Sequence, residues 1–143
     1  MKKNTLFVLM LLAALMLLLT GCKKPNLGVV SNGDNTMTIT AVNAKKDFFG
    51  GTAGVTLEEG QKIVIDSSLN AKGEILLRFS LSDLSDPNLS ISELTAAGSS
   101  ENAAYEVTVK GPGVTEVEAA PGSYALFAEV KSTASGTIDI RVK

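Results

Sequence analysis

Apolar and polar residues alternate along most of the chain from residue 36 onward. A period of two sends successive side chains to opposite faces of a β-strand, so each alternating run predicts a strand with one buried face. The clearest runs lie in the last third of the chain, and shorter ones lie upstream. They cover residues 37–41, 55–57, 63–65, 75–81, 105–110, 124–131 and 138–143.

Glycine and proline interrupt these runs at the spacing of short strands. The turn signals are Gly50-Gly51, Glu59-Gly60, Ala71-Lys72-Gly73, Gly111-Pro112-Gly113, Pro121-Gly122 and Ser135-Gly136. We therefore expect an all-β domain, an antiparallel β-sandwich of eight or nine short strands. A jelly-roll connection is the preferred topology and an immunoglobulin-like one is second, because one Cys and no Trp rule out the disulfide and the Trp typical of immunoglobulin domains.

Residues 82–104 show no clear period of either kind. The segment mixes Asp, Ser, Pro and Asn with the spaced apolar residues Leu89, Ile91 and Leu94. A loop, an irregular strand and a single helical turn are all compatible with this pattern, so its structure stays open.

The N-terminus has the layout of a secretory signal peptide. Lys2 and Lys3 precede a run of 14 apolar residues at positions 6–19. As a helix this run would span about 21 Å, which is short of the ~30 Å hydrocarbon core of a membrane. Cleavage is therefore the better interpretation, and a retained membrane span is the weaker one.

The apolar run ends in Leu19-Thr20-Gly21-Cys22, which resembles the lipobox of bacterial lipoprotein precursors. The resemblance implies cleavage between Gly21 and Cys22 and a thioether-linked diacylglycerol on Cys22. It makes the membrane a partner through the acyl chains on Cys22, and it places the protein at the extracytoplasmic face of the cell envelope. Two or three acyl chains attach a protein durably, whereas one chain binds only marginally.

These patterns divide the chain into three segments. We expect a lipoprotein signal peptide at residues 1–21, the lipidated Cys and a polar tether at 22–35, and the β-sandwich domain at 36–143. The tether is rich in turn-forming residues and has no period. Lys23 and Lys24 either attract anionic lipid beside the acyl chains or simply solvate the linker.

The composition excludes several classes of function. The chain has no His and a single Cys, so it cannot build a disulfide framework, a Cys/His zinc site or His-based catalysis. The 13 basic residues do not outnumber the 15 acidic ones, so no positive field attracts nucleic acid, and we expect none as a partner.

The chain also resembles, most clearly near its C-terminus, small secreted bacterial β-sandwich domains with a jelly-roll fold. The likeness rests on Pro121-Gly122-Ser123-Tyr124 and on Gly136-Thr137-Ile138, and it extends over residues 53–143. Such domains are appended to exported enzymes or displayed on lipoproteins. Some bind carbohydrate and others pack against a neighbouring module, so the resemblance does not select one function.

Three aromatic side chains are candidates for a binding surface. Phe127 falls on the outward phase of its strand, and Phe48 and Phe49 are adjacent, so both rings cannot point inward from one extended strand. The alternative is that Phe48 or Phe49 caps an open end of the sandwich. The remaining aromatics of the domain, Phe79, Tyr105 and Tyr124, are expected in the core.

One loop offers oxygen ligands for a structural Ca²⁺. Asp83, Asp86 and Asn88 lie within the six residues Asp-Leu-Ser-Asp-Pro-Asn, but the spacing does not follow an EF-hand loop. Asp, Pro and Asn are also ordinary turn residues. No other cofactor is expected.

Together these patterns predict a lipid-anchored, non-catalytic interaction or structural module, with an unidentified envelope protein or glycan as partner. A carbohydrate-binding module of the cell envelope is the alternative. A small hydrolase is the third possibility, because paired carboxylates can act on a glycoside. However, Glu58 and Glu59 diverge, Glu116 and Glu118 are expected to face solvent, and no Ser-x-x-Lys or Gly-x-Ser-x-Gly motif is present.

Overall fold

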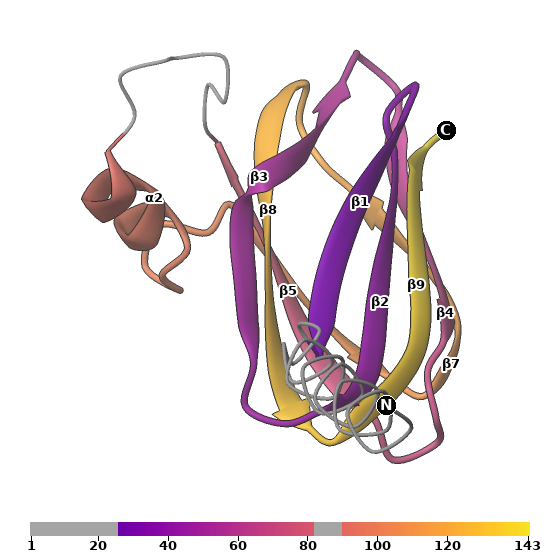
Figure 1. Ribbon diagram of the computed structural model, residues 1–143. Coiled ribbons are helices and arrows are strands. Elements are labelled where there is room, and N and C mark those ends of the chain that lie inside the picture. Colours follow the sequence, from indigo (N-terminus) through magenta and orange to yellow (C-terminus); the bar gives the residue numbers. More distant parts are fainter. Residues whose placement is uncertain (1–25, 82–89) are drawn as a thin grey trace, which may run out of the picture.

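The computed structural model describes residues 26–81 and 90–143 as two antiparallel sheets packed face to face (Figure 1). The five-stranded sheet consists, in spatial order, of β1 (Leu27–Gly33), β2 (Thr36–Ala44), β9 (Ala134–Val142), β4 (Lys62–Ser68) and β7 (Pro112–Glu118). The four-stranded sheet consists of β3 (Phe48–Leu57), β8 (Gly122–Ser132), β5 (Glu74–Leu81) and β6 (Tyr105–Lys110). The expected β-sandwich is confirmed.

The strand pairing is that of a jelly roll. From β2 to β9 the chain forms one long hairpin in which β2 pairs with β9, β3 with β8, β4 with β7 and β5 with β6. This hairpin is folded over so that successive pairs lie in alternate sheets, which is the arrangement of eight-stranded jelly rolls. β1 adds a ninth strand beside β2. The preferred topology is therefore confirmed over the immunoglobulin-like one.

Inward-facing side chains of the two sheets form one apolar core. Ile39, Ile65 and Ile140 enter it from the five-stranded sheet, and Leu77 and Leu126 enter it from the four-stranded sheet; each is at most 1% exposed. All five belong to the alternating runs, so the period of two identified the inner faces correctly. Phe79 and Tyr124 are buried and Tyr105 packs against the core, as expected.

The sandwich begins earlier than residue 36, so the expected end of the tether is wrong. β1 pairs antiparallel with β2 through a tight turn at Asp34 and Asn35, whose φ angles are 49° and 57°. Only Leu27 of this edge strand is buried, and Val29 packs partly against the core. Because most of β1 faces solvent, it carries almost none of the alternation that marks the inner strands.

Gly50 and Gly51 do not form a turn but lie inside β3. The pairing of β3 with β8 is irregular between Gly50 and Gly54, as expected where glycines allow a bulge. Gly50 also makes room for a neighbour, because a Cβ built at this position would collide with the ring of Phe127.

The segment that stayed open contains a short helix, α2 (Ile91–Ala97), between β5 and β6. Ser90 and Glu93 form a capping box: Ser90 Oγ accepts from the Glu93 amide at 3.2 Å, and Glu93 Oε2 accepts from the Ser90 amide at 2.8 Å. The Ser90 amide lowers the pKa of Glu93 below its ordinary value.

The helix segment covers part of the outer face of the four-stranded sheet (Figure 1). Ser80 Oγ donates to the carbonyl of Ala97 at 2.5 Å, and Arg78 Nη1 donates to the carbonyl of Gly98 at 3.4 Å. The outward-facing residues beneath it are therefore buried, which corrects the expectation of a fully solvated outer face. The segment contacts Arg78, Ser80 and Phe127, and Leu76 and Ala125 on the same outer face are buried as well.

Several expected features lie outside the described residues. They are the signal peptide, the lipobox with Cys22, and the candidate calcium ligands Asp83, Asp86 and Asn88. Within the described ranges, no helix is long and apolar enough to cross a membrane.

Candidate functional site

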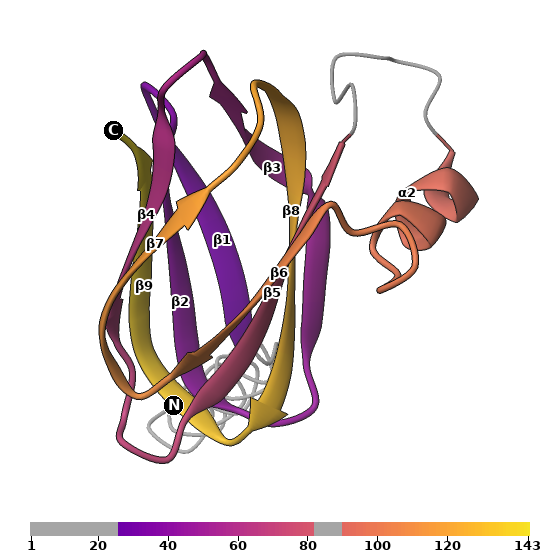
Figure 2. The ribbon, with the colours of Figure 1, turned by 180° about the vertical axis from the view of Figure 1, so that it is seen from behind.

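The sandwich is open along the side where β6 and β7 lie. These strands are the last of their sheets and are joined at one end through Gly111 (Figure 2). On the inward face of β7, Thr115 is exposed and Val117 is half-buried, although their β4 partners Ile65 and Ile63 are buried. By contrast, the inward residues in the second half of β3, the edge strand of the same sheet as β6, are buried. Among the described residues, the core is therefore less covered beside β7 than beside the second half of β3.

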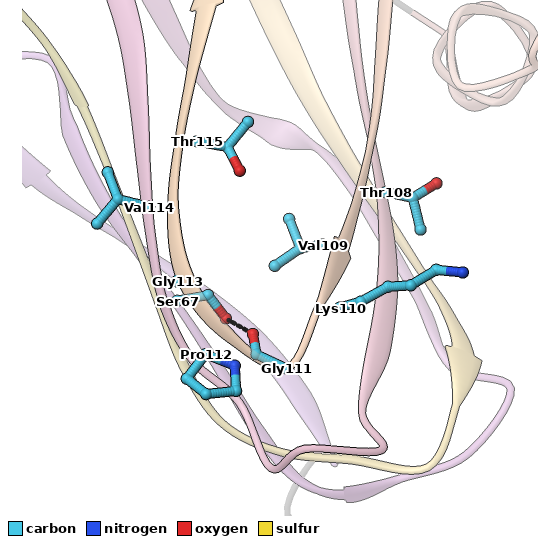
Figure 3. A pocket seen from close by; sticks show the side chains of 9 residues that line it. All are labelled: Ser67, Thr108, Val109, Lys110, Gly111, Pro112, Gly113, Val114 and Thr115. Atoms are coloured by element: carbon cyan, nitrogen blue, oxygen red, sulfur yellow. Dashed lines mark hydrogen bonds between the residues drawn. The ribbon is translucent and has the colours of Figure 1, made fainter.

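A hollow of about 260 Å³ occupies this open side near Gly111. Val109 of β6 and Thr115 of β7 point into the space between the two strands, while Val114 and Thr108 point away from it (Figure 3). At the base, Ser67 Oγ donates to the Gly111 carbonyl at 2.7 Å and fixes the connection. The lining residues are Ser67, Thr108, Val109, Lys110, Gly111, Pro112, Gly113, Val114 and Thr115.

The chemistry of this hollow suits binding through backbone groups and small side chains. Its lining has hydroxyl, methyl and peptide groups, and its only titratable side chain is Lys110. The Lys110 ammonium is paired with Glu74 at 3.5 Å. Because β6 and β7 each have a strand partner on one side only within the described chain, their other edges present backbone donors and acceptors.

A second hollow, of about 300 Å³, lies at the other end of the sandwich and is lined by Gly60, Lys62, Glu116 and Lys143. Lys62 Nζ lies 3.0 Å from Glu118 and 3.7 Å from Glu116. The hydrogen bond to Glu118 and the charges of both carboxylates raise the pKa of Lys62, so its amine stays protonated and is a poor nucleophile or base. Glu116 and Glu118 are both exposed, as expected.

The structure separates the three aromatic candidates by their exposure. Phe48 is 54% exposed, Phe49 is half-buried against the core, and Phe127 is 2% exposed. Phe127 does face outward from its sheet, but the segment after α2 covers it: a Cβ at Gly98 would lie 2.6 Å from its Cδ1. The expectation of a free Phe127 ring is therefore wrong. Its ring stacks on Phe48 with centroids 6.2 Å apart.

A charged network lies on the same outer face as Phe127. Arg78 pairs with Glu129 at 2.9 Å and with Glu106 at 3.2 Å, and Lys131 pairs with Glu129 at 2.5 Å. The hydrogen bond from Lys131, followed by that from Arg78, lowers the pKa of Glu129 below its ordinary value. Every charge in this network is compensated, so it holds the α2 segment rather than offering a free acid or base.

In the described ranges, no three His, Cys, Asp or Glu side chains gather into a metal site. The candidate ligands Asp83, Asp86 and Asn88 are outside those ranges, so the calcium site stays a prediction.

Sequence reasoning missed the open side. The strand β7 has no apolar alternation, and almost all of its residues are exposed. The sequence signals in this region are the Gly111-Pro112-Gly113 turn and, after it, the single apolar positions Val114 and Val117. These two residues lie three apart and thus on opposite faces of a strand, so they do not mark a buried face.

No protein-family model and no curated protein sequence matches this chain. Among solved structures, it is similar to the crystal structure of accessory secretory protein 1,2 and 3 in Streptococcus pneumoniae, with a TM-score of 0.36 and 14% sequence identity. The match covers 83% of this chain and 88% of that chain. A likeness at this level carries no argument about function.

Proposed function

We propose that this protein is a lipid-anchored, extracytoplasmic interaction module without catalytic activity, and that it binds an extended segment of an envelope protein along its open side. The observation that supports the binding edge is the exposure of Thr115 and the partial exposure of Val117 on the inward face of β7. An added strand would pair with a free backbone edge and cover these side chains at the same time.

The outer faces of the two edge strands limit which partners can pair there. Pro112 begins β7, and Glu116 and Glu118 project from it; Glu106 and Lys110 project from β6. Charges and Pro on an edge strand discourage indiscriminate pairing with other chains. A partner segment must therefore complement these charges, which favours a specific partner over self-association.

The membrane anchor is tested by replacing Cys22 with alanine. The lipobox resemblance predicts that Cys22→Ala blocks lipidation, because no other thiol exists to accept the diacylglycerol. We expect either uncleaved precursor or exported protein released from membranes. The measurement is membrane fractionation together with the mass of the N-terminal peptide. Mature-sized Cys22→Ala protein that still sediments with membranes would contradict the anchor.

The binding edge is tested by site-specific photo-crosslinking on whole cells. A photoreactive phenylalanine analogue at Val114 of β7, which is 62% exposed, should crosslink to a discrete envelope protein. Val30 of β1 is the matched control, because it is 61% exposed on a different edge strand. We expect an adduct from Val114 and none from Val30.

A second variant tests whether the crosslinked protein pairs with the β7 edge or only lies near Val114. Thr115→Arg places a long side chain in the mouth of the hollow on an exposed position, so the fold is retained while the Val114 adduct is lost. Equal adducts from Val114 and Val30, or an adduct that survives Thr115→Arg, would overturn the proposed edge.

The carbohydrate-binding alternative has less support. A sugar platform needs exposed aromatic faces, and in the described ranges Phe48 is the one aromatic ring that is more than half exposed, with one face stacked on Phe127. In the crosslinking experiment, an adduct that a glycosidase removes would favour this alternative over a protein partner.

A further inference from the structure

One end of the sandwich has a positive charge balance and the other has a negative one. The tether end is defined here as residues 43–47, 69–74, 110–113 and 129–136, at the end where β1 begins (Figure 1). It contains five lysines and three carboxylates. The far end, residues 32–36, 57–62, 116–122 and 141–143, contains five carboxylates and three cationic side chains. The domain is therefore polarised along the strand direction.

Three lysines of the tether end have no ion-pair partner among the described residues. Lys110 pairs with Glu74, and Lys131 pairs with Glu129. Lys45, Lys46 and Lys72 are exposed and form no ion pair with any residue that the structure describes.

Hydrogen bonds hold the loops of the tether end together. The Asn43 amide donates to Ser135 Oγ at 2.9 Å, and the Ser135 amide donates to Asn70 Oδ1 at 2.8 Å. The Asn70 amide in turn donates to the Ser135 carbonyl at 2.9 Å. The loop with Lys45 and Lys46 and the loop with Lys72 are thus joined through the turn between β8 and β9.

Apolar groups are exposed beside these lysines. Phe48 follows Lys46 by two residues and is 54% exposed, and Val42 is 59% exposed. The Val42 amide donates to the Asn26 carbonyl at 2.9 Å, which places Val42 where the described chain begins. Aromatic rings and lysines side by side are typical of surfaces that contact a membrane interface.

The expected anchor lies close to the same end. Leu27 pairs with Ala41 near the end of β2, and Cys22 precedes Leu27 by five residues. Five fully extended residues span at most about 18 Å. A membrane that holds acyl chains on Cys22 therefore lies within this distance of the start of β1.

We propose that the tether end is a membrane-facing surface on which Lys45, Lys46 and Lys72 bind the headgroups of anionic lipids. This inference rests on the proposed lipid anchor, which brings the surface to the membrane. Opposite charge at the far end reinforces the orientation, because an anionic surface attracts one end and repels the other. In this orientation the strands run away from the membrane surface, and the open side between β6 and β7 stays accessible to a partner.

The test is amine footprinting of the full lipidated protein reconstituted in vesicles. One set of vesicles contains phosphatidylcholine alone, and the other contains phosphatidylcholine mixed with phosphatidylglycerol. We expect labelling of Lys45, Lys46 and Lys72 by an amine-reactive reagent to fall several-fold in the anionic vesicles. Labelling of Lys143 at the far end should not change, and high salt should remove the protection because it screens the charges.

A triple variant isolates the charges. In Lys45→Gln/Lys46→Gln/Lys72→Gln, labelling of the tether-end residue Lys131 in anionic vesicles should rise to its value in phosphatidylcholine. The matched control is Lys143→Gln, which should leave the protection intact. Equal labelling of both ends in anionic vesicles would overturn the inference. A protein that fails to associate with either kind of vesicle would instead contradict the lipid anchor.

Discussion

Ile140→Ala is expected to lower the free energy of unfolding by about 2 to 5 kcal/mol. Ile140 is fully buried on β9, a central strand of the five-stranded sheet, and it pairs with Met37 of β2 and Ile65 of β4, both buried as well. Truncation removes apolar contacts and leaves a cavity that two fixed neighbouring strands cannot close.

Urea unfolding of a soluble chain that begins at residue 23 measures this loss, since all nine strands lie beyond that point. Thr108→Ala is the control, because Thr108 is exposed on β6 and its truncation should change stability by less than about 0.5 kcal/mol. A Thr108→Ala variant that loses as much stability as Ile140→Ala would mean that the inner and outer faces are exchanged.

The inner strands could be predicted because the core imposes a strict period on them. Ile63 and Ile65, for example, face inward from β4 on either side of Val64, and both are buried between two sheets. A shift of one residue would expose every such side chain to solvent. A strand that faces the core therefore needs apolar residues at alternate positions, and this alternation can be recognised in the sequence.

The edge strands and the helix could not be predicted in the same way. β1 buries only Leu27 fully, and β7 buries no residue fully, so neither strand needs an apolar face. Sequence reasoning overlooked the capping box of Ser90 and Glu93 at the start of α2, and seven residues are too few to show a helical period.

The exposed edge at β7 and the burial of the Phe127 ring both depend on contacts between distant parts of the chain. Thr115 is exposed because β7 is the last strand of its sheet in the described part of the chain, which follows from the order of the strands. Phe127 is buried because Gly98, about thirty residues away in the sequence, lies against its ring. A local pattern records which face of a strand a residue occupies, but not what covers that face.

Phe127→Ala is expected to lower the free energy of unfolding by about 3 to 5 kcal/mol, as for other buried aromatic side chains. This holds although Phe127 lies on the outer face of its sheet and not in the core that the two sheets enclose. Its ring fills the space between Gly50 of β3 and Gly98 after α2, and it stacks on Phe48. Phe48→Ala should cost less, because Phe48 is more than half exposed. Urea unfolding of both variants compares them directly, and similar small losses would contradict the packing of the α2 segment on the sheet.

Gly98→Ala tests the same contact from the other side. The added Cβ would lie 2.6 Å from Cδ1 of Phe127, which no real packing accommodates without a shift of the α2 segment or the ring. We expect a loss of about 1 to 3 kcal/mol. In a Phe127→Ala background the clash is absent, so Gly98→Ala should then cost much less. This double-mutant cycle measures the coupling between the two positions. Additive losses would mean that the Cβ at position 98 does not act through the Phe127 ring, and that other contacts hold this ring in place.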